Sequence, residues 1–272
     1  MNKIKVHDID FSVLNVMAHQ GSKSIIYEDD NICYKMLDLD YFFSYELNIL
    51  ERKLMDMDGI GINNVYLPVD LIVDNDRLVG WTLNKFKNSI PIYDKFSSQF
   101  LDFKELFECV LKASLILREI HKNKIICHDL SFDNILVDNN GNVAFCDLDG
   151  CFYNGYQSPF ISMPMKKLIC EYRKEEFIAS ENFDRISMLV SLYYLIYNKY
   201  LYRIPRYDFD SLSNKVETIY RTMPYVSSLL DKSISISEVP YFDELIGSSD
   251  DYIMDRKKEF SLLKRILRKR LV

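Results

Sequence analysis

The sequence has few alanines and no long apolar run. Only four alanines occur against 19 tyrosines and 17 phenylalanines, so we expect the helices to be stabilised by packing of bulky side chains more than by intrinsic propensity. No stretch of about 18 uncharged apolar residues exists, which argues against a transmembrane helix. The first 20 residues lack the apolar core and small-residue cleavage site of a signal peptide, and we therefore expect a cytoplasmic protein.

A basic surface and paired cysteines are also missing. The formal net charge is -6, whereas a non-specific nucleic-acid binder needs a cationic surface to displace counterions from phosphates. The six cysteines form no C-x-x-C pair and stand mostly among apolar neighbours. This pattern favours reduced, buried thiols over a zinc site.

The first third of the chain is rich in short strand-like runs. With 272 residues and 48% hydrophobic content, the chain can form one large domain or two modest lobes that share a cleft. Four β-rich runs separated by Asp and Asn turns are expected before residue 86, at 24–29, 31–37, 63–73 and 77–86. Between them a helix is expected at 41–57, because its apolar residues are spaced to cover a single face: Phe43, Leu47, Leu50 and Leu54.

The chain becomes mainly helical from about residue 100. A helix is expected over 101–124, with Asp102 and Glu105 as a capping box and an apolar stripe of Phe103, Leu106, Phe107, Val110 and Leu111. A second long helix is expected over 180–200. The change of pattern, together with Pro91, indicates a boundary near residues 86–90.

A hairpin that carries acidic residues interrupts the helical half. Strands are expected at 135–137 and 143–145, around an Asn- and Gly-rich turn. Asp129 and Asn134 precede the first strand and Asp147 follows the second, so both carboxylates lie at one end of the hairpin. Concentrating carboxylates beside buried strands is costly, and a ligand that binds them would offset the cost.

The segments "CHDLSFDNIL" and "CDLDG" resemble the catalytic and metal-binding loops of the eukaryotic-like protein kinase superfamily. In the pattern H-R-D-L-x-x-x-N the Asp falls on Asp129 and the Asn on Asn134, and the D-F-G Asp falls on Asp147. The interval of 18 residues between the aspartates, and His121 eight residues before the first, are also typical of the family. The agreement of three spacings is stronger than any one motif.

The resemblance covers roughly residues 11–205 and implies an α+β, bilobal protein kinase-like fold. It implies a single domain over 1–272, with a small β-rich N-lobe and its one main helix at about 1–88. The larger, mainly helical C-lobe would occupy about 89–272. In this family an aspartate at the start of a long buried helix ties down the backbone of the catalytic loop, and Asp184 matches that residue.

The resemblance also implies an ATP site in the N-terminal third. Lys35 and Glu46 match the ion pair that holds a strand lysine against the α and β phosphates. The glycine-rich loop falls on residues 19–26, where only the middle glycine is kept, and the implied nucleotide-binding positions are Gly21, Ser22, Ser24 and Ile26.

The implied reaction is transfer of the γ-phosphate of ATP to a serine or threonine hydroxyl of a protein. Lys35 would neutralise nucleotide phosphates, Asn134 and Asp147 would hold Mg²⁺, and Asp129 would orient the acceptor hydroxyl and accept its proton. Asp149 is either a second carboxylate on the metal side or a turn residue. The expected partners are ATP and a protein substrate, without nucleic acid.

Several positions depart from the family pattern. Ser131 replaces a lysine that touches the γ-phosphate, and His128 replaces the arginine that pairs with a phosphorylated activation loop. Such losses are typical of divergent bacterial kinase-like proteins and of small-molecule kinases. Two alternatives therefore remain: an aminoglycoside- or choline-type kinase, and a pseudokinase that acts as a nucleotide-binding interaction module. The basic residues of 255–272 permit contact with an acidic partner or membrane surface, although a final packing helix is favoured.

Overall fold

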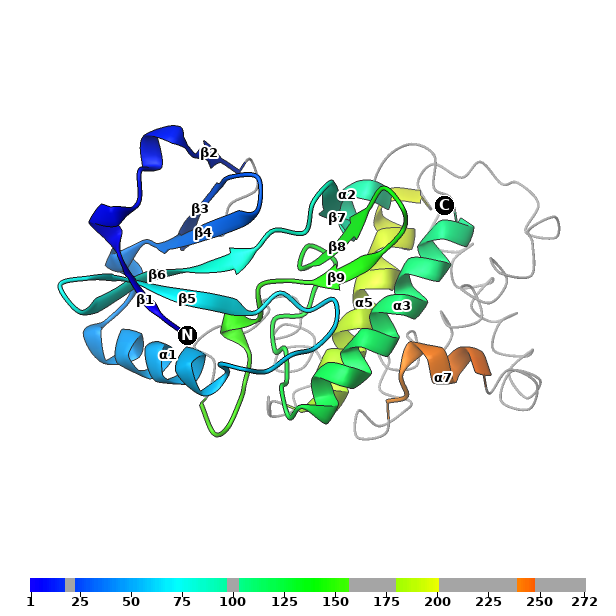
Figure 1. The fold of residues 1–272 in the computed structure, drawn as a ribbon. Coiled ribbons are helices and arrows are strands. Elements are labelled where there is room, and N and C mark those ends of the chain that lie inside the picture. The colour runs from blue at the N-terminus through cyan, green and yellow to red at the C-terminus, as the bar shows by residue number, and fades with distance from the viewer. Residues whose placement is uncertain (18–22, 97–102, 157–179, 201–238, 248–272) are drawn as a thin grey trace.

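The computed structural model describes residues 1–17, 23–96, 103–156, 180–200 and 239–247. Over these residues the protein is α+β, with a six-stranded sheet region followed in sequence by a region that contains the longest helices (Figure 1). The expected helix at 255–272 lies outside the described residues, as do Gly21 and Ser22.

The six-stranded sheet has the order β1-β5-β6-β4-β3-β2. β1 pairs with β5 in parallel and every other neighbouring pair is antiparallel. The strands are β1 (Lys3–Lys5), β2 (Asn15–Val16), β3 (Ser24–Glu28), β4 (Ile32–Leu37), β5 (Pro68–Asp74) and β6 (Arg77–Asn84). The four predicted strand-like runs correspond to β3, β4, β5 and β6, whereas β1 and β2 are too short to produce a recognisable alternation.

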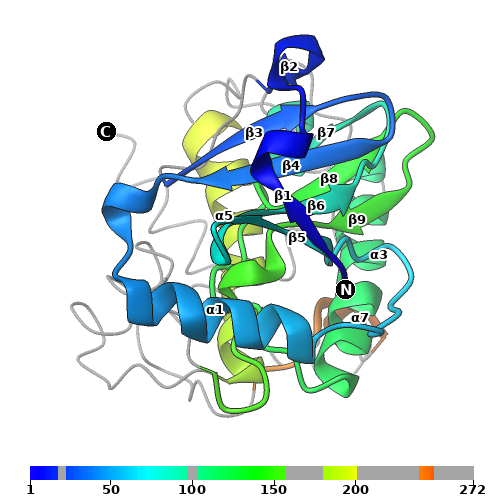
Figure 2. The ribbon, with the colours of Figure 1, turned by 60° about the vertical axis from the view of Figure 1, so that its left-hand side comes forward.

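Helix α1 (Ser44–Asp56) lies along one face of this sheet (Figures 1 and 2). Leu47, Leu50 and Leu54 are buried as predicted, and the last two pack against Leu71, Leu78 and Trp81 of β5 and β6. The prediction for Phe43 is wrong, because this residue precedes the helix as its N-cap and is 69% exposed.

Gly80 allows β6 to lie close to β4 beside the candidate site. It pairs with Met36, and a Cβ at Gly80 would overlap the carbonyl oxygen of Lys35. The next residue, Trp81, is fully buried opposite Lys35, and its ring lies 5.3 Å from the Lys35 Nζ. The sheet therefore fixes the backbone from which the Lys35 side chain extends.

The second region combines a three-stranded sheet with helices. The elements are β7 (Ser89–Pro91), α2 (Ile92–Phe96), α3 (Phe103–Lys122), β8 (Ile135–Asp138), β9 (Val143–Phe145), the 3-10 turn η4 (Leu148–Gly150), α5 (Glu181–Tyr200) and α7 (Phe242–Gly247). The remaining 3-10 turns are η1 (Val6–Asp8), η2 (Phe11–Val13) and η3 (Leu39–Tyr41). The sheet order is β7-β8-β9. The predicted lobe boundary at 86–90 stays a prediction.

The predicted hairpin is confirmed as β8 and β9. They pair antiparallel, and Gly141 adopts a left-handed φ of 74° in the turn between them. The Asp138 carboxylate accepts hydrogen bonds from the backbone N–H groups of Asn140 and Asn142 and thereby stabilises the turn. β7 was not predicted, because Pro91 argues against a strand, but it pairs at the outer edge of the sheet where proline is tolerated.

The main core forms between α3, the hairpin and α5. Of the stripe predicted for α3, Leu106, Phe107 and Val110 are buried and Leu111 is partly buried, while Asp102 lies outside the described residues. The start of α5 contributes Phe183 and Ile186 to the same core. The second predicted helix, expected over 180–200, is confirmed as α5 at Glu181–Tyr200.

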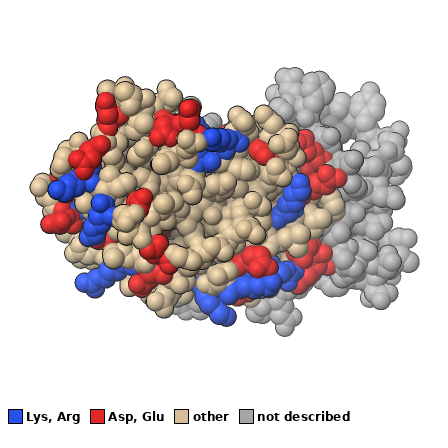
Figure 3. Space-filling view, viewed as in Figure 1, with Lys and Arg blue, Asp and Glu red and all other residues tan. Residues whose placement is uncertain are grey.

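Charge is unevenly distributed over the face seen in Figure 3. In the view of Figure 3, charged side chains lie around the margin of the face and its centre is largely uncharged. No helix in the described ranges is long and apolar enough to cross a membrane. The five cysteines within those ranges are free thiols, and the prediction that they are buried holds for Cys109, Cys127 and Cys151, whereas Cys33 and Cys146 are partly buried.

Substitution of Gly80 tests the close contact between β6 and β4. We expect Gly80→Ala to lower the free energy of unfolding by about 1–3 kcal/mol, because the added methyl group overlaps a backbone carbonyl that cannot rotate away. Urea denaturation measures the change, with Gly61→Ala as control because a Cβ there meets nothing within 4 Å. Equal stability of the two variants would contradict the packing described here.

Candidate active site

Lys35 lies between two aspartates at the centre of the site. Its Nζ forms ion pairs with Asp147, and with the Oδ1 of Asp149 at 2.8 Å. Burial alone would lower the pKa of Lys35, but Asp149 and Asp147 raise it above its usual range. The structure therefore brings a lysine from β4 into contact with two carboxylates that follow β9.

The backbone after β9 places both carboxylates beside Lys35. Asp147 has left-handed dihedral angles (φ 62°, ψ 37°), which aspartate tolerates better than most residues, and η4 follows at once. The side chain of Asp147 is 44% exposed, whereas that of Asp149 is only 8% exposed. The two groups thus differ in their access to solvent although they share one ammonium partner.

The shared ammonium affects the two carboxylates in opposite ways. Burial opposes ionisation of Asp147, but Lys35 outweighs it and lowers the pKa of Asp147 below its usual value. Burial, together with the charge of Asp147, raises the pKa of Asp149 despite the presence of Lys35. Asp147 is therefore the more readily ionised and the more accessible member of the pair.

Asp129 and Asn134 lie on the loop before β8. The Nδ2 of Asn134 donates to the backbone carbonyl of Asp129 at 2.9 Å, which leaves its Oδ1 available to a ligand. The backbone N–H of Cys146, immediately before Asp147, donates to the carbonyl of Asn134 at 3.0 Å. Burial and then the nearby Asp147 raise the pKa of Asp129, so these two acids are electrostatic neighbours.

Asp184 ties down the loop that carries Asp129, as predicted. Its two carboxylate oxygens accept hydrogen bonds from the backbone N–H groups of Cys127 at 2.6 Å and His128 at 2.9 Å. Asp184 is 1% exposed, and His128 adopts a left-handed φ of 68°. The carboxylate therefore stabilises a strained backbone directly before Asp129.

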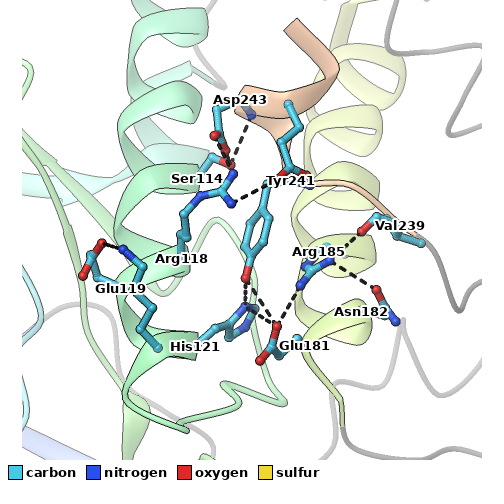
Figure 4. A network of polar contacts seen from close by, with 12 residues as sticks. Ser114, Arg118, Glu119, His121, Glu181, Asn182, Arg185, Val239, Tyr241 and Asp243 are labelled. Atoms are coloured by element: carbon cyan, nitrogen blue, oxygen red, sulfur yellow. Dashed lines mark hydrogen bonds and ion pairs between the residues drawn. The ribbon is translucent and has the colours of Figure 1, made fainter. Parts of the chain in front are cut away.

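His121 extends this anchor to a third element. Its Nε2 lies 2.9 Å from the Oδ2 of Asp184. Its Nδ1 lies 2.7 Å from the hydroxyl of Tyr241 (Figure 4). The guanidinium groups of Arg118 and Arg185 flank the Tyr241 ring at 4.1 and 3.9 Å. The network joins α3, α5 and the start of α7, so His121 has a structural part in this region.

The predicted ion pair between Lys35 and Glu46 is not formed. Glu46 is the third residue of α1, and its Oε2 accepts a hydrogen bond from the backbone N–H of Phe43 at 2.8 Å. Among the described residues, Lys35 pairs with Asp147 and Asp149 instead. Glu46 therefore stabilises the beginning of its own helix, where an acidic side chain is favourable.

The structure describes two of the four predicted loop positions. Ser24 is the first residue of β3 and is buried, and Ile26 is partly buried and pairs with Lys35 across β3 and β4. Ile26 therefore lies on the strand next to the site lysine. Gly21 and Ser22 fall outside the described ranges, and their predicted contacts with nucleotide remain predictions.

Lys53 is a site residue that the sequence did not reveal. It lies on α1, is 2% exposed, and donates hydrogen bonds to the backbone carbonyls of Asp149 and, at 3.0 Å, of Cys151. The one available signal was its position beside Leu50 and Leu54 on the apolar face of the helix. A charged residue on such a face indicates a buried partner.

The oxygen groups suit a magnesium ion bound together with phosphate. Asp147 offers a partly exposed carboxylate, and Asn134 offers an amide oxygen that accepts no hydrogen bond from the residues the structure describes. No three His, Cys, Asp or Glu side chains are gathered as a metal-binding group in the described ranges. This is compatible with Mg²⁺, which usually takes one or two protein carboxylates and completes its coordination with water and substrate phosphates.

Comparison with known proteins gives one distant similarity. The chain is 25% identical over 122 residues to the serine/threonine-protein kinase shk2 of Schizosaccharomyces pombe. The match covers 45% of this chain and 20% of that kinase. No family model matches the chain. The similarity indicates a distant, kinase-like relationship.

Removal of Asp184 tests the anchor of the Asp129 loop. We expect Asp184→Ala to lower the free energy of unfolding by about 3–5 kcal/mol, because the buried N–H groups of Cys127 and His128 lose their acceptor and His121 loses its charged partner. Urea denaturation measures the effect. The exposed Glu119–Lys122 pair provides the control, since Glu119→Ala should cost no more than about 1 kcal/mol. A loss at Asp184 as small as that of the control would show that the loop does not depend on this carboxylate.

Proposed function

We propose that the protein is a divergent serine/threonine protein kinase that transfers the γ-phosphate of ATP, with magnesium, to a protein hydroxyl. The observation that carries this proposal is the contact of Lys35 on β4 with Asp147 after β9, beside the loop of Asp129 and Asn134. The distant similarity to a serine/threonine kinase supports the same chemistry. In this proposal the described sheet region with α1 belongs to the N-lobe, and a single kinase-like domain spans 1–272 with the lobes meeting near residue 88.

The side chains have distinct parts in the proposed reaction. Lys35 would exchange its contact with Asp147 for nucleotide phosphates, and Asn134 and Asp147 would hold Mg²⁺ through their oxygens. Bound magnesium supplies neutralisation of the phosphate charge. Ser24 and Ile26 belong to the strand that would border the nucleotide, together with Gly21 and Ser22.

Asp129 would accept the proton of the acceptor hydroxyl. The new bond joins that oxygen to the γ-phosphorus, the bond from the γ-phosphorus to the β–γ bridging oxygen breaks, and ADP leaves with the electron pair. The raised pKa of Asp129 suits it to hold this proton. Asp184 keeps the preceding backbone in place throughout.

Isosteric substitutions test the proposed roles of the two aspartates. We expect Asp129→Asn and Asp147→Asn each to lower phosphoryl transfer by about 10²- to 10⁴-fold, because one removes the proton acceptor and the other a magnesium-binding charge. The assay uses labelled ATP and Mg²⁺ with a generic protein substrate and, separately, a panel of small hydroxyl compounds.

The exposed turn residue Asp30 provides the control, since Asp30→Asn removes a carboxylate without touching the site. Label on protein that both site variants lose supports the proposal. Label confined to small hydroxyl compounds supports an aminoglycoside- or choline-type kinase instead. Nucleotide binding without any transfer supports the pseudokinase alternative, and transfer that survives both substitutions contradicts all the assigned roles.

A further inference from the structure

Two residues outside the predicted catalytic set hold the Lys35 site together. The Asp149 carboxylate forms an ion pair with the Lys35 ammonium group. The Lys53 ammonium group donates hydrogen bonds to the backbone carbonyls of Asp149 and Cys151. Both side chains are almost entirely buried. Neither position follows from the kinase pattern, in which Glu46 on α1 was expected to pair with Lys35.

Asp149 occupies the place that Glu46 was expected to take. Its carboxylate lies 2.8 Å from the Lys35 Nζ and is shielded from solvent, whereas Glu46 is bound to the backbone of Phe43. A shielded carboxylate interacts with an ammonium group more strongly than an exposed one does. Because Asp147 is the more exposed member of the pair, a ligand can draw Asp147 away while Asp149 remains beside Lys35.

Lys53 supplies the connection to α1 that Glu46 does not. Burying an ammonium group costs several kcal/mol unless its hydrogens are bonded, and a methionine of similar length would avoid that cost. The ammonium of Lys53 donates to two carbonyls in the segment directly after Asp147. Because these acceptors are backbone atoms, Lys53 fixes the path of the loop irrespective of its side chains.

We propose that Asp149 and Lys53 are positioning residues that replace the usual helix-to-strand ion pair: Asp149 holds Lys35, and Lys53 holds the Asp149 loop against α1. This inference rests on the proposed kinase function. It places the acidic partner of Lys35 on the loop after β9, and it makes Lys53 the residue that connects this loop to α1. A shift of α1 would then move the loop backbone to which Lys53 is bonded, and with it Asp147.

Nucleotide binding and transfer measured on the whole chain test the inference. Asp149→Asn should weaken binding of a fluorescent ATP analogue about tenfold and raise the KM for ATP by a similar factor, because Lys35 loses a charged hydrogen-bond partner. Lys53→Met should raise the magnesium concentration for half-maximal transfer about tenfold, because Asp147 loses its fixed loop. Thermal unfolding of each variant separates these effects from loss of folding.

Two variants on α1 complete the experiment. Glu51→Gln is the matched control, because Glu51 pairs with Lys3 away from the site. Glu46→Gln tests the residue that the kinase pattern paired with Lys35, and it keeps an acceptor for the Phe43 N–H at the start of the helix. Both should bind the analogue as the wild type does. Weakened binding in Glu46→Gln with normal binding in Asp149→Asn would overturn the inference, as would an unchanged magnesium requirement in a folded Lys53→Met protein.

The failure of this inference is distinct from failure of the proposed function. A wild-type protein that neither binds the analogue nor transfers phosphate contradicts the kinase function and the inference together. A wild-type protein that does both, with Asp149→Asn indistinguishable from Glu51→Gln, contradicts the inference alone. If Lys53→Met does not fold, the Asp149→Asn result still decides the assignment of the Lys35 partner.

Discussion

The structure around the candidate site depends on one buried ammonium group placed between two carboxylates. Lys35 is separated in sequence from Asp147 by 112 residues and from Asp149 by 114. Each of these charges would be costly to bury without an opposite charge beside it. Together they connect β4 of the large sheet to the segment after β9. Pairing of Gly80 and Trp81 with β4 fixes the strand side of this contact, and Lys53 fixes the loop side.

Sequence patterns predicted the parts of the fold whose cause is local. The alternation in β3 to β6 and the turn chemistry of the β8–β9 hairpin reside within single segments, so their existence could be recognised without neighbours. Asp184 could be predicted to bind the backbone before Asp129 because the kinase pattern associates that function with the beginning of a long buried helix. The short strands β1 and β2 depend on pairing with distant strands, and nothing local identifies them.

The partners of the two site lysines could not be predicted for the same reason. Glu46 has a suitable charge for Lys35, but it stands at the first turn of α1, where the free N–H groups of the helix start compete for its carboxylate. The sequence was equally compatible with Asp149 as a turn residue and as a carboxylate of the site. Its burial results from contact of the loop with α1, which the local sequence does not reveal. Lys53 was not identified from the sequence, and only the tertiary contact shows that its ammonium group points inward.

Two buried charges of opposite sign, Asp184 and Lys53, each hold the backbone of one of the two loops of the site through hydrogen bonds. Asp184 accepts hydrogen bonds from consecutive backbone N–H groups just before Asp129, and Lys53 donates to backbone carbonyls just after Asp147. Each loop also contains a residue with a left-handed φ, His128 in one and Asp147 in the other, a conformation that most residues avoid. The backbone strain and the charged anchor thus occur together at both places, because a strained loop keeps its shape only where strong, shielded hydrogen bonds oppose its relaxation. Asp129 and Asp147 are thus held through the backbone beside them, by Asp184 before Asp129 and by Lys53 after Asp147.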